Sequence, residues 1–373
     1  MNNLFPEVKK NLGLGCMRFP MIGEDVDVTE LTKMVDCFME NGFNYFDTAP
    51  IYINGKSEIV LKEVLTSRYP RESYVLTDKL STSCFETEEE ILPLFEKQLE
   101  ICGVEYFDFY LMHSQNRKLF EKYKKCHAYE IALELKKQGK IKHFGISFHD
   151  NAEMLEEILT EYPEIEVVQI QLNYVDYDDA SIQSRKVYEM CRKYNKPVIV
   201  MEPVKGGTLV KLPDDAVSVF EDLKGGSPAS YAIRFAAGFE GIFMVLSGMG
   251  TLDMVEENVS YMKNFEPLNQ KELDAVLKVK EILASKNIVP CTKCNYCLNG
   301  CAKNIPIPGI FACMNSDNTY KGWTGKFYYG IVTQKGGKAS TCVKCGKCEE
   351  LCPQKIELRN MLELAVETFE KAE

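Results

Sequence analysis

Short apolar runs alternate along the chain with longer amphipathic stretches, and this alternation repeats eight times before residue 270. The runs have the length of buried strands, whereas the stretches place apolar residues three or four positions apart, as helices covering a sheet do. The predicted strands are Leu12–Met17, Asn44–Asp47, Tyr74–Lys79, Phe107–His113, His143–Ser147, Val167–Gln171, Pro197–Met201 and Met244–Ser247. The predicted helices that follow them are Thr29–Glu40, Ser57–Ser67, Glu88–Cys102, Ala128–Gln138, Ala152–Thr160, Ser181–Tyr194, Pro228–Ala237 and Leu252–Met262.

Eight successive strand–helix units predict an α/β fold with a parallel sheet closed into a (β/α)8 barrel. The alternative is an open, doubly wound sheet that binds a dinucleotide. Such a sheet should carry G-x-G-x-x-G after its first strand. Residues 13–18 read GLGCMR and lack the third glycine, so the barrel is preferred.

The composition and periodicity of the sequence change beyond the barrel. One more helix is predicted over Gln270–Ser285, and Cys, Gly, Lys and Pro become dense from Pro290 onward. Regular periodicity returns only in a last predicted helix, Leu358–Glu370. We therefore predict two domains, a barrel over residues 1–286 and a small domain over residues 287–373.

Charge is distributed unevenly between these two parts. The net charge is −11, yet residues 286–373 hold 12 Lys and Arg against 8 Asp and Glu, so the barrel part carries about −15. Such an acidic barrel argues against nucleic acid, whose binding depends on basic side chains that neutralise phosphates. No apolar run approaches the roughly 18 residues that cross a membrane, and residues 1–10 show no apolar leader. We expect a cytoplasmic protein without a membrane partner.

Eight of the fifteen cysteines lie in two runs with the same C-x2-C-x2-C-x3-C spacing. This repeated pattern is typical of bacterial ferredoxins with two 4Fe-4S clusters, in which the fourth cysteine of each run binds the other cluster. The prediction is one cluster on Cys291, Cys294, Cys297 and Cys352. The second cluster is predicted on Cys342, Cys345, Cys348 and Cys301.

Two zinc sites are the alternative interpretation of the cysteine runs. Zinc sites use pairs of C-x2-C motifs separated by a gap, and they do not need a third cysteine at the same interval. Iron–sulfur clusters are therefore preferred. Because few large aliphatic residues flank the cysteines, we expect the clusters to form the core of a ferredoxin-like domain.

Four polar residues follow successive strands of the predicted barrel. They are Asp47, Tyr52, Lys79 and His113, and active sites of such barrels lie at the carboxyl ends of the strands. A carbonyl reductase needs a proton donor, and Tyr52 can serve if a buried Lys79 favours its phenolate. Asp47 offers Lys79 an anionic partner, and His113 can polarise a carbonyl oxygen. Each residue alone could be structural, but the four together predict a catalytic site.

With these residues in place, the chain resembles the aldo-keto reductase family, in particular its bacterial branch with a C-terminal ferredoxin-like domain. The motifs that carry the resemblance are Leu12–Arg18, Phe46–Glu58, Asp108–Gln115, Gly139–Asp150, Val168–Tyr174, Met201–Gly207 and Leu246–Asn258. The resemblance implies that Tyr52 is the general acid, supported by Asp47, Lys79 and His113.

The resemblance also implies a nicotinamide site. Ser147 and Gln169 would hold the carboxamide, and Pro203, Gly206 and Gly207 would lie along the pyrophosphate. Ser247, Gly248 and Gly250 would lead into a helix N-terminus that suits phosphate, with Asn258 near the adenine. The Lys and Arg that usually clamp the 2′-phosphate are replaced by Gly248 and Met254. We expect NADPH or NADH as cofactor, with little discrimination between them.

The leading functional hypothesis is an oxidoreductase that reduces a small carbonyl compound or a related electrophile. The alternative is an electron-transfer protein or ferredoxin-coupled reductase, in which the clusters pass single electrons to or from a protein partner and nicotinamide is not needed. A regulatory subunit without catalysis is a third class, and the intact set of four polar residues counts against it.

Overall fold

The computed structural model describes residues 4–179, 182–223, 225–286, 288–320, 323–334 and 336–371, apart from the side chains of Thr319, Tyr320, Trp323 and Thr324. The chain forms two compact units. The first consists of Met1–Asp179, Gln183–Pro203 and Ile233–Leu268. The second consists of Ala180–Ile182, Val204–Ala232 and Asn269–Glu373.

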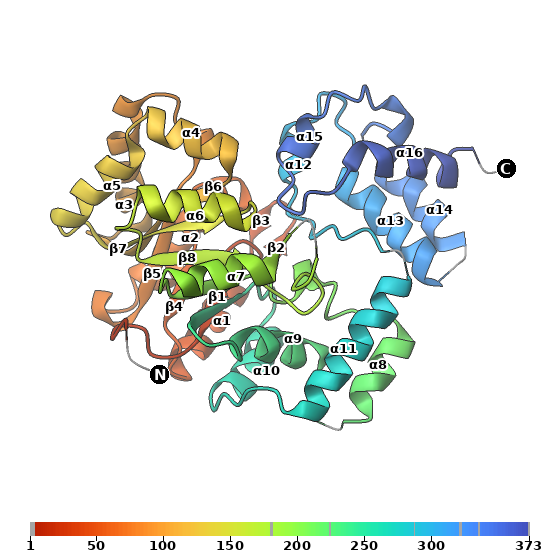
Figure 1. Ribbon diagram of the computed structural model, residues 1–373, viewed down its shortest axis with the longest axis horizontal. Coiled ribbons are helices and arrows are strands. Elements are labelled where there is room, and N and C mark those ends of the chain that lie inside the picture. The colour runs from red at the N-terminus through yellow and green to blue at the C-terminus, as the bar shows by residue number, and fades with distance from the viewer. Residues whose placement is uncertain are drawn as a thin grey trace. The chain divides into compact units, whose positions relative to one another are not determined.

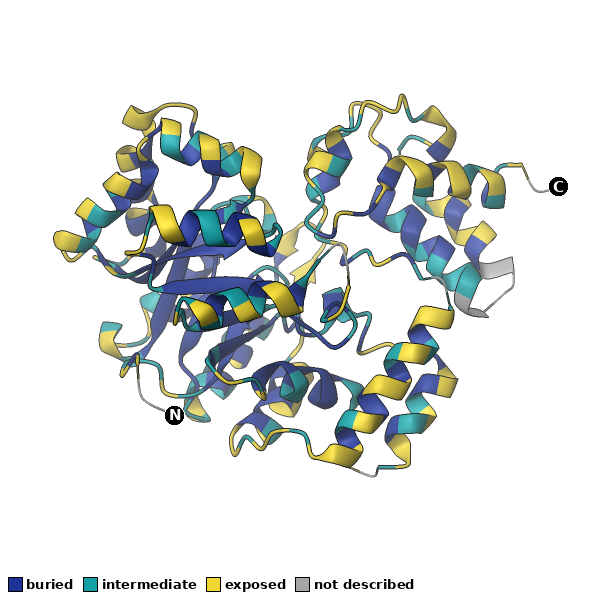
Figure 2. Cartoon of the chain, viewed as in Figure 1, coloured by how far each residue is buried: buried dark blue, intermediate teal, exposed yellow. Residues whose placement is uncertain are grey.

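The first unit is a closed parallel barrel of eight strands, as predicted (Figure 1). The strands are β1 (Leu12–Gly15), β4 (Tyr45–Asp47), β5 (Val75–Leu80), β6 (Phe107–Gln115), β7 (Ile141–Phe148), β8 (Val167–Gln171), β9 (Val198–Met201) and β10 (Ile242–Ser247). The ring closes at β1, where Leu14 pairs with Phe46 on one side and Ser247 on the other. Nearly every strand residue is buried, because the barrel interior and the surrounding helices cover both faces (Figure 2).

Helices follow the strands in the order expected from the sequence. They are α1 (Val28–Glu40), α2 (Lys56–Leu61), α3 (Ile91–Cys102), α4 (Arg117–Lys125), α5 (Ala128–Lys137), α6 (Ala152–Glu161), α7 (Ser184–Lys193), α9 (Pro228–Ala237, which spans both units) and α10 (Leu252–Met262). Short turns of helix add η1 (Tyr52–Gly55), η2 (Lys62–Thr66), η3 (Arg71–Ser73), η4 (Thr82–Cys84) and η5 (Glu88–Glu90), and a hairpin joins β2 (Met21–Ile22) to β3 (Asp25–Val26). Ser181, the predicted start of the sixth helix, lies outside the described residues.

The sequence did not predict α4. Six of its nine residues are charged, and its buried side chains are Phe120 and Tyr123. With so few apolar positions the helical period is weak. The structure forms it because Asn116 caps its first turn by accepting a hydrogen bond from the amide of Leu119 at 3.0 Å.

Within the described residues, the regular secondary structure of the second unit consists of helices joined by loops. It contains η6 (Lys205–Gly207), α8 (Asp214–Glu221), α11 (Gln270–Ser285), α12 (Tyr296–Asn299), α13 (Ile307–Tyr320), α14 (Trp323–Val332), η7 (Ala339–Thr341), α15 (Lys347–Glu350) and α16 (Leu358–Phe369). The predicted helix Gln270–Ser285 is confirmed with the same bounds. Helices α13 and α14 were not predicted, because their glycines and polar residues obscure the helical period.

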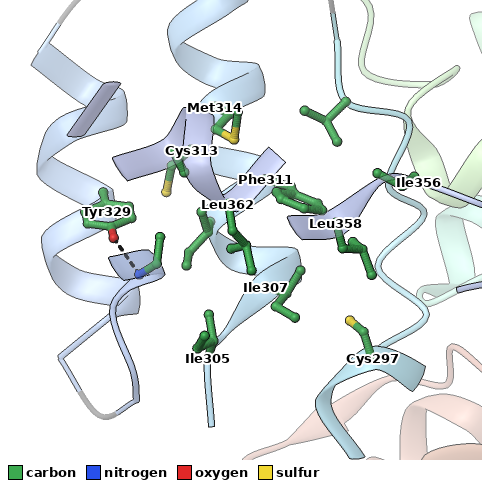
Figure 3. Close-up of a cluster of buried hydrophobic side chains, with 14 of the residues drawn as sticks. Cys297, Ile305, Ile307, Phe311, Cys313, Met314, Tyr329, Ile356, Leu358 and Leu362 are labelled. Atoms are coloured by element: carbon green, nitrogen blue, oxygen red, sulfur yellow. Dashed lines mark hydrogen bonds between the residues drawn. The ribbon is translucent and has the colours of Figure 1, made fainter. Parts of the chain in front are cut away.

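The C-terminal part has an apolar core formed by its own side chains, and cysteines of both runs pack against it. Ile305, Ile307, Phe311, Leu358 and Leu362 pack together, with Cys297 at the edge of the group (Figure 3). The hydroxyl of Tyr329 accepts a hydrogen bond from the amide of Ala339 at 3.0 Å and ties α14 to η7. These residues stand singly in the sequence, so only the fold shows that they form a core beside the cysteines.

None of the helices in the described part of the chain has the length and apolar character that crossing a bilayer requires.

Candidate functional site

A buried ion pair lies at the carboxyl end of the barrel. The Lys79 ammonium is 2.6 Å from Asp47 Oδ1, and neither side chain is more than 3% exposed. Lys79 also donates to the carbonyl oxygen of Thr48 at 2.7 Å, and Gln169 donates to Asp47 Oδ2 at 3.1 Å. The predicted pairing of Lys79 with Asp47 is therefore confirmed. Each of the two charged groups also forms a further hydrogen bond, as a buried ion pair requires.

Tyr52 and His113 complete the group. The Lys79 ammonium lies 4.8 Å from the centre of the Tyr52 ring, and the rings of Tyr52 and His113 are 6.0 Å apart in an edge-to-face arrangement. Tyr52 is half-buried and begins η1, in which Ile53 and Asn54 adopt left-handed backbone angles. The fold thus brings together the four polar residues that the sequence placed after separate strands.

Electrostatics at this site differ from the prediction in one respect. Burial, followed by the Asp47 carboxylate, raises the pKa of Tyr52 well above its ordinary value. The sequence predicted that Lys79 would favour the phenolate. Because Asp47 is bound directly to Lys79, its negative charge offsets the ammonium, so burial determines the direction. Tyr52 therefore keeps its proton at neutral pH.

His113 is held as a neutral imidazole. Burial, with smaller contributions from Lys79 and His149, lowers its pKa well below the ordinary value. Its Nδ1 lies 2.6 Å from the hydroxyl of Ser81. When Ser81 donates this hydrogen bond, the ring carries its proton on Nε2 and can donate it to a ligand. Sequence analysis missed Ser81, whose one signal is its place directly after β5.

Two residues assigned to the carboxamide lie on neighbouring strands. Ser147 in β7 accepts a hydrogen bond from the amide of Ser114 at 2.8 Å, and it pairs in register with Gln169 in β8. Ser147 keeps a hydroxyl proton to donate, and Gln169 retains Oε1 as an acceptor beyond its bond to Asp47. This donor and acceptor suit a carboxamide.

The loop between β10 and α10 and the elements beside it contain residues that were predicted to bind the cofactor. Asn258 donates to Ser247 Oγ at 2.9 Å and accepts from Tyr261 at 2.5 Å, which connects helix and strand. The side chain of Arg18 lies against Gly248, where an added Cβ would meet it at 3.0 Å, and the Arg18 carbonyl faces Gly250. Arg18 is thus a cation beside this loop that sequence analysis did not identify, because it is distant in the chain.

The N-terminus of α10 is already occupied by protein groups. Thr251 accepts a hydrogen bond from the amide of Met254 at 3.3 Å, and Glu30 on α1 accepts one from the amide of Leu252 at 3.0 Å. A helix N-terminus favours an anion. Here the carboxylate of Glu30 takes one of the amides that was expected to meet phosphate.

The three remaining predicted cofactor residues follow β9. Pro203 belongs to the first unit, whereas Gly206 and Gly207 lie in η6 of the second unit. Both glycines have positive φ angles, of 61° and 94°. A Cβ on Gly206 would lie 2.4 Å from the carbonyl oxygen of Thr292, so this loop contacts the first cysteine run directly.

Comparisons with known proteins identify the barrel. Residues 11–281 match the model of the aldo/keto reductase family. The chain belongs to the aldo/keto reductase family. It is an oxidoreductase of a family whose members depend on NAD(P)H.

Individual relatives of this reductase are distant. It is 28% identical to the 9,11-endoperoxide prostaglandin H2 reductase of Trypanosoma cruzi over 59% of this chain and 74% of that protein. It is 27% identical to the NADH-specific methylglyoxal reductase of Escherichia coli over 45% of this chain and 54% of that one. Among solved structures, an aldo/keto reductase from Klebsiella pneumoniae in complex with NADP and acetate shares the fold with a TM-score of 0.58, at 17% identity, over 72% of this chain and 90% of that one.

The segment that contains the two cysteine runs is repeated in backbone conformation as well as in cysteine spacing. Lys293 and Lys344 share a φ of 56°, Asn304 and Lys355 share a φ of 51°, and each pair is separated by 51 positions, as the cysteines are. Helices α12 and α15 occupy equivalent places within the two cysteine runs, and α13 and α16 begin at equivalent positions. Two copies of one loop-and-helix unit therefore form this segment.

The cysteines of the two runs influence one another in the fold. Burial, and then the charges of Cys294, Cys291, Cys352 and Cys348, raise the pKa of Cys297 to about 12. Cys301, which completes the other predicted set, lines one hollow together with Cys342, Cys345 and Cys348. Cysteines collected in this way could bind a metal or a cluster once they are deprotonated.

Proposed function

We propose that this aldo/keto reductase reduces a small carbonyl compound with Tyr52 as proton donor. The observation that carries the proposal is the single cluster of Asp47, Tyr52, Lys79 and His113, in which Tyr52 retains its proton beside a buried ammonium. A bound nicotinamide would supply hydride to the carbonyl carbon. Ser147 and Gln169 would hold the carboxamide of that nicotinamide.

Side chains of the protein would then supply the proton and stabilise the charge that its transfer leaves behind. The hydroxyl of Tyr52 donates it to the carbonyl oxygen as negative charge develops there, and neutral His113 donates a hydrogen bond to the same oxygen. The Lys79 ammonium stabilises the phenolate that remains, and Asp47 holds that ammonium in place. Loss of the phenolic proton produces an alcohol and a tyrosinate, which water reprotonates.

Replacement of the proton donor tests this role. Tyr52→Phe should keep the fold and the affinity for nicotinamide and lose carbonyl reduction by about 10²–10⁴-fold, the contribution typical of a general acid. Nicotinamide affinity is measured by fluorescence titration, and turnover by oxidation of NADH or NADPH with a carbonyl panel. The matched control is Tyr106→Phe, which removes the hydroxyl of a tyrosine outside the group and should leave turnover unchanged. Unchanged turnover in Tyr52→Phe would remove this residue from the mechanism.

We also propose that residues 287–373 form a cluster-binding domain that holds two 4Fe-4S clusters. Cys291, Cys294, Cys297 and Cys352 would hold one, and Cys342, Cys345, Cys348 and Cys301 the other. The support is the two-fold repeat of the loops and the hollow that Cys301 lines together with Cys342, Cys345 and Cys348. Bound clusters would exchange single electrons, which suits an electron-transfer partner, and the cytoplasm would keep the cysteines reduced.

Two measurements test whether the clusters are bound: the metal content of the protein, and the effect of replacing one predicted cysteine ligand. Protein purified without oxygen should contain about eight iron and eight sulfide per chain. Cys301→Ala should remove mainly the cluster of the second run, seen as loss of one of two electron paramagnetic resonance signals, whereas Cys313→Ala should leave both. Stoichiometric zinc would exclude iron–sulfur clusters, and loss of the first cluster in Cys301→Ala would contradict the crossed assignment.

A further inference from the structure

Two carboxyl groups are buried together beside Lys79. Asp78 lies in β5 with no exposed surface, and Glu58 lies in α2 with 3% of its surface exposed. A carboxyl oxygen of Asp78 and one of Glu58 lie within 4.8 Å of each other. Two buried carboxylates this close repel one another, which favours the state in which one of them carries a proton. The pair therefore contains one proton and one negative charge.

The surrounding donors place the proton on Asp78. Burial and the charge of Glu58 raise the pKa of Asp78 well above its ordinary value. Burial also raises the pKa of Glu58, but hydrogen bonds from Asp78 and Gln98 oppose that change. Gln98 Nε2 donates to Glu58 Oε1 at 3.1 Å, and a donor at this oxygen favours the charged form of Glu58. We therefore assign the negative charge to Glu58 and the proton to Asp78.

The same groups hold the backbone of Lys79 on both sides of its Cα. Asp78 Oδ1 accepts a hydrogen bond from the amide of Lys79 at 2.8 Å. Gln98 Nε2 donates to the carbonyl oxygen of Lys79 at 3.1 Å, and Tyr110 fixes the orientation of this amide by donating to Gln98 Oε1 at 2.6 Å. The carboxyl pair and Gln98 therefore determine where the Lys79 side chain begins.

We propose that Asp78 and Glu58 are positioning residues for the proton-transfer site, which hold Lys79 beside Tyr52 through one shared proton and one negative charge. The inference rests on the proposed role of Tyr52. Glu58 holds the side-chain amide of Gln98, and the neutral Asp78 fastens the backbone of Lys79. Lys79 is thereby kept 2.6 Å from Asp47 and 4.8 Å from the Tyr52 ring centre.

A proton suits this cluster better than a cation does. Cys102 Sγ lies 3.8 Å from Asp78 Oδ2, so three side chains are close enough to surround a metal ion. Cysteine binds metals as the thiolate. Burial, then Asp78 and Glu58, raise the pKa of Cys102 well above its ordinary value, which keeps the thiol protonated. The other titratable groups that face the pair are Lys79, Cys84, Tyr110, Cys16 and Tyr52.

Two isosteric variants separate the proton from the charge. Asp78→Asn retains a donor toward Glu58 and an acceptor for the Lys79 amide, so turnover and its pH dependence should stay within about twofold of wild type. Glu58→Gln removes the charge and should lower kcat about ten- to hundredfold, as misplacement of a reacting group does. Its alkaline limit should move to lower pH, because a nearby carboxylate favours the protonated form of a phenol. The control for net charge is Glu63→Gln, which removes the carboxylate of an exposed side chain in η2.

Infrared spectroscopy reads the proton without turnover. Wild type at neutral pH should show the carbonyl stretch of a buried protonated carboxyl group, and Asp78→Asn should lack it. A chain without carbonyl reduction would defeat the proposed function, yet the infrared result would still decide the state of the pair. The proposal is overturned if Asp78→Asn keeps that band, if it is as inactive as Glu58→Gln while folded, or if Glu58→Gln keeps the wild-type pH profile.

Discussion

At the scale of single residues, the charges at the barrel mouth are set by neighbours from distant parts of the sequence. Asp47 would favour its neutral form when buried, but Lys79 and Gln169 supply the opposite charge and the donor that oppose this. Tyr52 lies close enough to both ions to be influenced by each. The net result is a protonated phenol beside an ammonium, which is the state that a proton donor needs before it reacts.

The carboxylate of Glu30 is expected to influence which nicotinamide cofactor binds. Its carboxylate lies 3.0 Å from the amide of Leu252 at the start of α10, where a 2′-phosphate would add further negative charge. Glu30→Gln removes this repulsion and should improve NADPH affinity about three- to tenfold, while NADH affinity stays unchanged. The factor corresponds to about 1 kcal/mol, within the range of a charge at a helix terminus. Dissociation constants for both nucleotides provide the measurement.

The matched control for this test is Glu40→Gln, which removes a carboxylate from the other end of α1. An equal gain for NADH and NADPH in Glu30→Gln would show that the carboxylate acts on the helix and not on the phosphate.

At the scale of elements, the turn η6 connects the loop after β9 with the first cysteine run. Gly206 lies against the peptide of Thr292, which stands between Cys291 and Cys294. Gly207 has a similar left-handed backbone, but a Cβ added there would have no neighbouring atom within 4 Å. The two adjacent glycines thus differ in surroundings and share the same backbone cost.

This difference predicts the effect of two alanine substitutions. Each should cost about 1–2 kcal/mol for a left-handed alanine. Gly206→Ala should in addition displace Thr292 and reduce the iron held by Cys291, Cys294, Cys297 and Cys352, toward about four iron per chain. Gly207→Ala should keep both clusters. Iron analysis with electron paramagnetic resonance distinguishes them, and equal losses in the two variants would contradict a specific contact.

At the scale of the whole molecule, charges at the opposite end of the barrel support stability. Burial would raise the pKa of Glu166, but hydrogen bonds from His143, Lys136 and the amide of Phe144 lower it to about 2. A carboxyl group with a lowered pKa stabilises the folded state above its unfolded pKa, and this stability is lost as pH falls toward the folded value.

Acid unfolding measures this contribution. Glu166 is about one third exposed, so solvent screening reduces its value, and Glu166→Gln should cost about 1–2 kcal/mol at pH 7. The difference from wild type should shrink between about pH 4.5 and pH 2, because Glu166 becomes protonated there in the unfolded and then the folded state. Urea unfolding at several pH values provides the measurement. A difference that stays constant down to pH 2 would exclude the titration of Glu166 as its cause.

The sequence by itself determined the barrel and the cysteine repeat. Both depend on local periodicity: eight apolar runs with intervening helices define the barrel, and equal spacing defines the repeat of the two cysteine runs. The predicted helices Pro228–Ala237, Leu252–Met262 and Gln270–Ser285 have the observed bounds because capping residues and apolar positions agree in each. The four polar residues were also found in this way, since parallel strands direct their carboxyl ends to one rim.

Only the tertiary structure decided the contacts between distant segments. Glu58 and Asp78 stand 20 positions apart, Glu30 and Leu252 more than 200, and no local pattern relates them. The protonation of Tyr52 likewise depends on how deeply the fold buries it and on which charges surround it. Periodicity records which face of an element is covered, whereas pKa values and hydrogen bonds depend on what covers it, and that is a property of the folded chain.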